Sequence, residues 1–310
     1  MWLLRRVGAG IASLAAAAWL AATLSFFALR ALPGDAIRSQ LVISGASEAV
    51  IAERRAALGL DDPLPVQYVR FLVGVLRGDL GTSLIDGQPV TDILLRALPP
   101  TLALAGSALA VAAALGLGLG TAAALKLRGI TPLARLLLTL SLSVPIYWTG
   151  TLAIYLFAAR LNWLPSGGAG DASALILPAL ALGFHTAGAI ARVTQASIEA
   201  AIRAPFIATA RAKGLPEHTI ILRHALRHAL PPVVSVTALQ AGFLLGGVVI
   251  TESLFARPGI GRILLDAALN QNYPVVQGAV IWAALAYTFA STAADMLTGI
   301  IDPRTYAEAA

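Results

Sequence analysis

Residues 199–232, EAAIRAPFIATARAKGLPEHTIILRHALRHALPP, form the most basic stretch of the chain, and the reading of the fold depends on them. The stretch holds five Arg or Lys residues and three His against two Glu. A Lys or Arg at the centre of a bilayer costs roughly 2.5–3.5 kcal/mol, so this stretch does not cross a membrane. Apolar segments that are long enough to cross one lie on both sides of it. The stretch is therefore predicted to be a structured loop on one membrane face.

The composition of the 310-residue chain is that of a membrane protein. The chain is 58% hydrophobic and 12% charged, whereas soluble domains carry about 25% charged residues. It contains no cysteine, which excludes disulfides, thiolate metal sites and a cysteine nucleophile. Its net charge of +6 would suit nucleic acid, but the basic residues lie between apolar spans and not on one solvated face. We expect a lipid bilayer and no nucleic acid as the partner of this surface.

The apolar segments predict an all-α integral membrane protein with six transmembrane helices. Residues 7–29 carry no charge, and their length at about 1.5 Å per residue crosses a hydrocarbon core of roughly 30 Å. A signal peptide is the alternative for this segment, but the run exceeds the usual apolar length of about 7–15 residues. The other predicted spans are residues 101–125, 136–159, 175–191, 233–251 and 274–301.

The sequence also predicts structural or functional roles for several residues in or next to these spans. Pro145 should kink the third span. Glu252 should lie at the outer interface after the fifth span. Asp295 lies within the last span, where it is either a structural polar contact or part of a pathway. The second span contains glycines that would allow close helix contact, namely Gly106, Gly116, Gly118 and Gly120.

The region between the first two spans predicts a small helical insertion outside the membrane. Ser47 can cap a helix that Gly59 ends, and a second helix follows Pro63 with apolar residues at helical spacing. A plain connecting loop is the alternative for this region.

The basic residues predict the orientation of the spans. The N-terminus, the turn 126–135, the loop 192–230 and the C-terminal tail hold twelve Lys or Arg residues. The short loops on the other side hold three, if the long segment between the first two spans is left out because long loops follow the rule poorly. Both termini and the basic loop are therefore predicted to be cytoplasmic.

The sequence contains no recognisable catalytic or metal-binding set. It has no G-x-x-x-x-G-K-[ST] phosphate loop and no G-x-S-x-G nucleophile motif. His224 and His228 have the i, i+4 spacing of metal ligands, but no third ligand accompanies them, so a solvated helix face is favoured. We expect no enzyme activity, no metal and no cofactor bound by this chain.

The basic stretch itself divides into two helices separated by a glycine. Pro205 suits the first turn of a short helix over residues 206–213, which Gly214 ends. Residues 221–230 place apolar side chains on one half of the helical wheel and Arg and His on the other. This pattern predicts an amphipathic helix along the membrane surface.

Short motifs distributed over nearly the whole chain resemble one family. They are TARAKGL (209–215) and LRHAL (222–226) in the basic loop, with LPGD (32–35), LGLDDP (58–63), GDLG (78–81), WLP (163–165), PGIG (258–261), YPVVQG (273–278) and DPR (302–304) elsewhere. Together they resemble the B-type permease subunits of ABC importers for dipeptides, oligopeptides, nickel and glutathione. The general loop pattern of such permeases is E-A-A, three residues, then Gly. Counted back from Gly214, this pattern begins at Ala208, so the Glu of the pattern is missing in this chain. The sequence Glu199-Ala200-Ala201 does not fit the pattern, because the required Gly would fall at Pro205.

The resemblance implies the type I ABC importer permease fold. It implies a first helix over 1–32, an extracytoplasmic helical insertion over 33–98, a permease core over 99–302 and a cytoplasmic tail over 303–310. Within the core, the loop 199–231 would carry a cytoplasmic coupling helix between the fourth and fifth spans. The residues it assigns to ATPase coupling are Phe206, Ala208, Thr209, Ala210, Arg211, Ala212, Lys213, Gly214 and Leu215. Residues suggested for the pathway are Gln240, Gly242, Gly246 and Asp295.

The resemblance also implies a function and partners. The chain would be a permease in a prokaryotic inner membrane, working with a second related permease, two cytoplasmic ATPases that bind ATP and Mg, and an extracytoplasmic substrate-binding protein. Di- or oligopeptides are the expected cargo, with nickel chelates or glutathione as the alternative within the family. An ATPase-independent transporter or channel is the alternative of another class, but we find no convincing internal repeat to support it.

Overall fold

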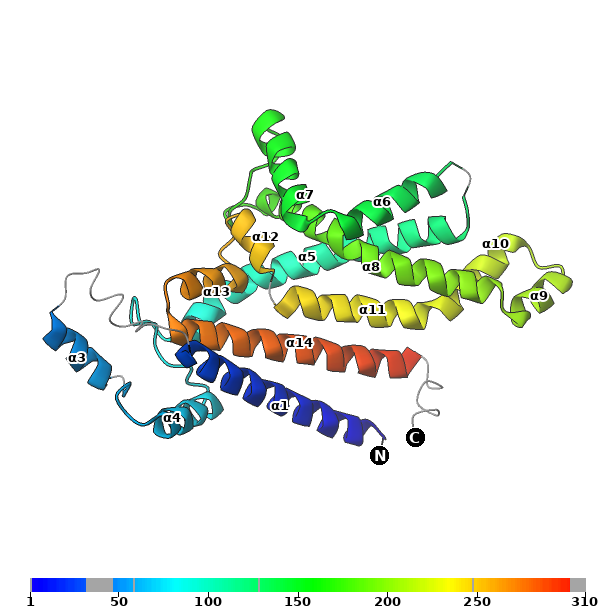
Figure 1. Ribbon diagram of the computed structural model, residues 1–310. Coiled ribbons are helices and arrows are strands. Elements are labelled where there is room, and N and C mark those ends of the chain that lie inside the picture. The colour runs from blue at the N-terminus through cyan, green and yellow to red at the C-terminus, as the bar shows by residue number, and fades with distance from the viewer. Residues whose placement is uncertain (1, 32–46, 58, 128, 247, 302–310) are drawn as a thin grey trace.

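The computed structural model describes residues 2–31, 47–57, 59–127, 129–246 and 248–301. Helices form the architecture of these residues, and the only β-pairing among them is an isolated bridge between Thr82 and Pro89. The long helices lie side by side in one bundle (Figure 1). The all-α architecture predicted from the sequence is thereby confirmed.

Among the described residues, five helices are long and apolar enough to cross a membrane, or six if one bent pair counts as a span. The five are α1 (Trp2–Ala31), α5 (Val90–Ala124), α8 (Ile176–Ile202), α11 (Leu226–Gly246) and α14 (Tyr273–Ile301). The bent pair consists of α6 (Thr131–Ser143) and the continuous segment formed by α7 (Ile146–Ala153) and the π-helical η1 (Ile154–Arg160).

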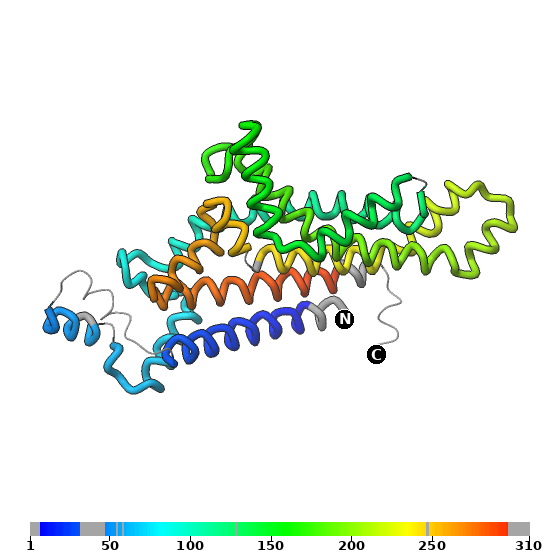
Figure 2. Tube along the Cα trace, turned by 45° about the horizontal axis from the view of Figure 1, so that its top comes forward, coloured from blue at the N-terminus to red at the C-terminus, as the bar shows by residue number. Residues whose placement is uncertain are grey.

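The break between α6 and α7 is sharper than the kink expected at Pro145. The two helices are bent by 110°, and α7 with η1 rises away from the bundle (Figure 2). Val144 has φ −87° and ψ 126°, the extended conformation that a following proline favours because its ring clashes with a helical neighbour. Pro145 therefore ends one helix and precedes the next instead of kinking a single span.

Close packing between α5 and α8 forms the centre of the bundle. A Cβ on Gly116 would lie 2.7 Å from Ile190, and one on Gly120 would lie 2.6 Å from the Ala191 carbonyl oxygen. These two glycines, four residues apart, let the helix backbones approach each other. Gly106 and Gly118 have no such neighbours within 4 Å, so the expectation of close contact holds for two of the four glycines.

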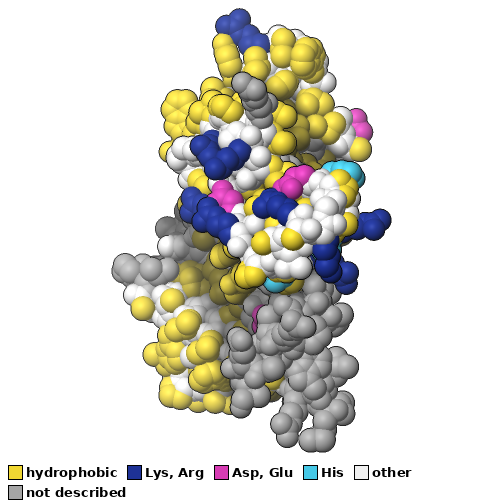
Figure 3. All heavy atoms as spheres, turned by 90° about the vertical axis from the view of Figure 1, so that its right-hand side faces the viewer, with side chains coloured by type: hydrophobic (Ala, Val, Ile, Leu, Met, Phe, Trp, Pro, Cys, Tyr) yellow, Lys and Arg dark blue, Asp and Glu magenta, His cyan; other side chains and the backbone are white. Residues whose placement is uncertain are grey.

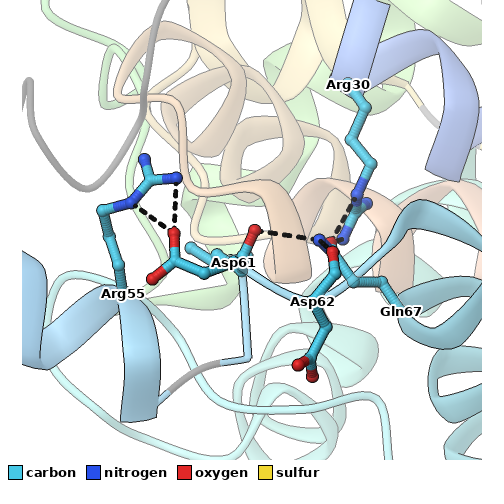
Figure 4. Close-up of polar contacts among 6 residues, drawn as sticks. Arg30, Arg55, Asp61, Asp62 and Gln67 are labelled. Atoms are coloured by element: carbon cyan, nitrogen blue, oxygen red, sulfur yellow. Dashed lines mark hydrogen bonds and ion pairs between the residues drawn. The ribbon is translucent and has the colours of Figure 1, made fainter.

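The described residues of the insertion that follows α1 include the short helices α3 (Glu48–Ala57) and α4 (Leu64–Leu76), which the sequence predicted. Gln67 links this region to α1: its Oε1 accepts from Arg30, while its Nε2 donates to the carbonyl oxygens of Leu60 and Asp62 (Figure 4). The Arg55 side chain on α3 forms an ion pair with Asp61, in the turn before α4, at 2.9 Å. The insertion is therefore attached to the end of α1 by defined polar contacts.

A helical hairpin after α11 closes the same end of the bundle. It consists of α12 (Val249–Leu254) and α13 (Ile260–Leu269). Glu252 on α12 is fully buried within the protein. Its Oε2 accepts from the amides of Gly261 and Arg262 at 2.8 and 3.2 Å, which satisfies donors at the start of α13.

Candidate functional site

The basic loop is a compact unit between α8 and α11 at the far end of the bundle from α3 (Figure 1). It contains α9 (Pro205–Ala212), the single-turn α10 (Glu217–Thr219) and the π-helical η3 (Ile220–Ala225), which runs on into α11. Pro205 occupies the first turn of α9, as the sequence predicted. A proline is tolerated at this position because a backbone N–H in the first turn of a helix has no intrahelical acceptor.

The end of α9 is a Schellman motif centred on Gly214. The Leu215 amide donates to the Ala210 carbonyl at 3.3 Å, and the Gly214 amide donates to the Arg211 carbonyl at 2.9 Å. Gly214 has φ +74°, in the left-handed region that residues with a Cβ adopt only with strain. The glycine therefore fixes where the helix ends and how the chain turns back.

A small apolar cluster attaches α9 to both neighbouring helices. Its buried members are Ile207 and Ala210 of α9, Ala201 of α8, and Ile220 and Ala225 of η3. Ile207 is fully buried. These contacts join α9 to the end of α8 and to η3, which runs on into α11.

Polar and aromatic contacts hold the two halves of the loop together. The Arg211 guanidinium donates to both carboxylate oxygens of Glu217, one of them at 3.2 Å, and this hydrogen bonding raises the pKa of Arg211. The rings of Phe206 and His228 meet edge-on with centroids 5.2 Å apart. Both contacts lie on the surface of the loop, so they orient it without burying charge.

The predicted coupling residues lie mostly on the outer face of α9. Phe206, Ala208 and Thr209 are exposed, as is the whole stretch from Arg211 to Leu215. Ala210 is buried and belongs to the loop's own core, so it cannot contact another protein directly. Lys and Arg side chains gather over this end of the molecule (Figure 3).

Two expectations for this region need correction. The segment 221–230 is not a separate helix along the membrane surface, because η3 continues into α11 and residues Glu217–Leu245 form one candidate span. The fifth span was predicted to begin at residue 233, but Pro231 and Pro232 lie inside α11, which begins at Leu226. Glu199 belongs to the last turns of α8, where it accepts from Gln195, which agrees with the out-of-register reading of Glu199-Ala200-Ala201.

The residues suggested for the pathway are not gathered into one site. A Cβ on Gly242 would lie 3.2 Å from Tyr287 and 3.3 Å from Ala290, so this glycine serves the packing of α11 against α14. Gln240 is half-buried on α11, Gly246 is the last residue of α11, and Asp295 is exposed on α14.

Two anchors of the site were not singled out from the sequence. Ile207 lies three residues before Ala210, and this spacing places both side chains on the inner face of α9. Glu217 pairs with Arg211, six residues earlier and across a turn, and no local sequence pattern indicates this contact.

Two protein families match the chain, one over each of its two parts, and both are membrane components of the same kind of transport system. Residues 114–306 match the family described as binding-protein-dependent transport system inner membrane component. Residues 1–105 match the N-terminal part described for the membrane components of the same transport systems.

The chain is also similar to characterised relatives over nearly their whole length. It is 39% identical over 283 residues to the glutathione transport system permease protein GsiC of Pectobacterium atrosepticum, covering 90% of this chain and 92% of the relative. It is 34% identical over 287 residues to the protein of the same name from Escherichia coli K12, covering 92% and 93%.

A solved structure supports the fold. An inward-facing structure of the MetNI methionine ABC transporter superposes with a TM-score of 0.59 at 18% identity, covering 68% of this chain and 96% of that chain. The chain therefore belongs to the family of binding-protein-dependent transport system inner membrane components and is a non-enzymatic permease subunit of an ABC importer.

Proposed function

We propose that this permease subunit forms half of the translocation pathway of a glutathione importer. The names of its relatives, at 34–39% identity over nearly the full chain, support glutathione over the broader di- and oligopeptide cargo expected from the sequence. Glutathione is itself a tripeptide, so the two readings share a chemistry of small, charged, peptide-like solutes. Nickel chelates remain the second alternative of this family.

The proposed assembly contains a second related permease, two ATPases and an extracytoplasmic binding protein. The ATPases would bind ATP and Mg, and the binding protein would select the cargo. The end of the bundle that carries α9 would face the cytoplasm, together with the start of α1 and the end of α14 (Figure 1). The excess of Lys and Arg in the loops at that end supports this orientation.

In this proposal α9 is the coupling helix. Its outer face presents small side chains at Ala208, Thr209 and Ala212, and so suits a groove in a partner ATPase. The observation that carries the proposal is the buried cluster of Ile207 and Ala210 with Ala201 and Ala225, because it joins α9 to both adjacent helices. Closure of the ATPases would push α9, and the cluster would transmit that movement to α8 and α11.

A bulky side chain introduced on the outer face of α9 tests this coupling role. Ala208 and Ala200 are both exposed alanines, the first on α9 and the second on α8. Ala208→Trp should abolish most ATP-driven uptake and release the ATPases on purification. Ala200→Trp is the matched control and should leave both unchanged. If the Ala208→Trp transporter keeps full uptake and retains its ATPases on purification, α9 is not the helix that docks on the ATPase.

The cargo is tested separately, in proteoliposomes that contain the whole transporter and its binding protein. Labelled glutathione should be taken up in an ATP-dependent manner, and unlabelled glutathione should compete better than a dipeptide. If a dipeptide or a nickel chelate competes better than glutathione, the cargo assignment fails while the coupling role of α9 stands.

Gln240 and Asp295 are the residues we retain as lining of the proposed pathway. Gln240 is half-buried and Asp295 is exposed, so each has a side chain that a solute or a second permease could reach. Gln240→Ala and Asp295→Asn should each raise the KM for uptake without changing the amount of assembled transporter. An unchanged KM in both variants would place the pathway elsewhere.

A further inference from the structure

A groove between α6 and α8 lies near the end of the bundle that carries α9. Its volume is about 360 Å³, and both helices supply its walls. Arg135 comes from α6 and Arg192 from α8, together with the polar side chains of Ser143 and Gln195. The proposed coupling role uses none of these residues.

The two arginines bring positive charge without a counter-ion. Neither guanidinium makes an ion pair or a hydrogen bond with any part of the chain that the structure describes, and no carboxylate lines the groove. The nearest acidic side chain along α8 is Glu199, which is held by Gln195 at 2.9 Å and by Arg203 at 3.8 Å. The groove therefore favours an anion.

The groove also has an apolar wall that leads away from the charge. Leu138 and Leu142 line it, one and two turns beyond Arg135 on α6. At about 1.5 Å per residue, Leu142 lies roughly 10 Å further into the bundle than Arg135. Arg135 is itself near the start of α6, at one end of a candidate span. A charged end followed by an apolar strip matches an amphiphile whose charge lies at the membrane boundary.

We propose that this groove binds the headgroup of an anionic phospholipid. The phosphate would lie between Arg135 and Arg192, because a guanidinium matches phosphate oxygens with two parallel hydrogen bonds. One acyl chain would follow Leu138 and Leu142. Basic pockets between spanning helices bind anionic headgroups in this way, and each Arg near a membrane surface strengthens such binding by about fivefold. The proposal goes beyond the import function and does not depend on the cargo.

Lipid retention by the full-length chain, purified with its co-purifying subunits in phosphatidylcholine nanodiscs, tests the site. Phosphatidylglycerol is titrated in, and bound molecules are counted by native mass spectrometry. The double variant Arg135→Gln/Arg192→Gln should weaken phosphatidylglycerol binding at least tenfold. The matched control Arg223→Gln/Arg227→Gln also removes two exposed arginines but lies outside the groove, and it should bind as the unchanged protein does.

Other outcomes separate the alternatives. Equal loss in both double variants would mean general surface charge, and no loss in the groove variant would mean no site; either result overturns the proposal. Displacement of the lipid by millimolar inorganic phosphate or by glutathione would assign the groove to a free anion or to the cargo. Arg135→Lys/Arg192→Lys keeps the charge and should retain binding above the Gln variant, which guards against a loss caused only by misfolding.

Discussion

The hydroxyl of Thr101 on α5 donates a 2.7 Å hydrogen bond to Oε1 of Glu252 on α12, across 151 residues of sequence. The same hydroxyl accepts from the Ile260 amide at 2.9 Å. Through this chain of hydrogen bonds, one buried carboxylate fixes the start of α13 and joins the α12–α13 hairpin to the central helix of the bundle. Burying a carboxylate is costly, and these bonds offset that cost.

Removing the Glu252 carboxylate should destabilise the protein strongly. Glu252→Ala leaves the donors of Thr101, Gly261 and Arg262 without partners, and each buried unsatisfied group costs about 1–3 kcal/mol. We expect a loss of about 3 kcal/mol or more, seen as a lower Tm in detergent. Glu252→Gln keeps one acceptor oxygen and should lose about half as much. Equal Tm values for Glu252→Ala and the unchanged protein would contradict this account.

The stability of this region should also depend on pH through Glu252. Burial raises the pKa of Glu252, an effect larger than the lowering by its hydrogen bonds to Thr101 and the α13 amides. A raised pKa means that the folded state binds the proton more tightly than the unfolded state does. The contribution is therefore complete below the ordinary Glu pKa and is lost as the pH rises through the folded pKa.

The pH effect is measured as the Tm of the unchanged protein and of Glu252→Gln between pH 4 and 8. The difference between the two curves should shrink as the pH rises above the ordinary Glu pKa and through the folded pKa, because only the unchanged protein loses the contribution. Parallel curves would show that Glu252 does not titrate there. The Thr101→Ser variant keeps the hydroxyl and serves as a control that should follow the unchanged protein.

Gly259 should not accept a side chain, because a Cβ there would overlap the Glu252 carboxylate. Gly259→Ala must push that carboxylate off its hydrogen-bond partners, which should cost about 2–3 kcal/mol. Gly170 has no heavy atom within 4 Å of its Cβ position, so Gly170→Ala is the matched control and should leave Tm unchanged. Similar Tm values for the two variants would mean that the hairpin adjusts without strain.

How far the sequence predicts the structure differs from one element to another. The limits of α9 were predicted to within one residue, because Pro205 and Gly214 act through local backbone geometry. The burial of Glu252 was not predicted, since its partners on α5 and α13 come together only in the folded bundle. Prolines show the same limit: Pro145 separates two helices, while Pro99 and Pro100 lie inside α5. Tertiary neighbours decide whether a proline ends a membrane helix.

Two glycines on α5 should respond in opposite directions to the same change. A Cβ on Gly120 would press on the Ala191 carbonyl and on Thr194, so Gly120→Ala should separate α5 from α8 and cost about 1–3 kcal/mol. Gly118, two residues earlier, has open space around its Cβ position, and Gly118→Ala should be neutral or stabilise by up to about 1 kcal/mol. Thermal unfolding of the two variants compares them directly, and equal destabilisation would argue against close α5–α8 packing.

The turn after α9 should depend on the backbone of Gly214 and not on space around it. No heavy atom lies within 4 Å of its Cβ position, yet its φ is +74°. Gly214→Ala should therefore cost about 1–2 kcal/mol through strain alone, and Gly214→Asn should cost less, because Asn visits the left-handed region more readily. Hydrogen exchange measures this locally: the Leu215 amide, which donates to the Ala210 carbonyl, should exchange faster in Gly214→Ala than in Gly214→Asn. The reverse order would mean that the Schellman motif does not hold the end of α9. If α9 also couples to an ATPase, ATP-driven uptake should fall in the same order as amide protection.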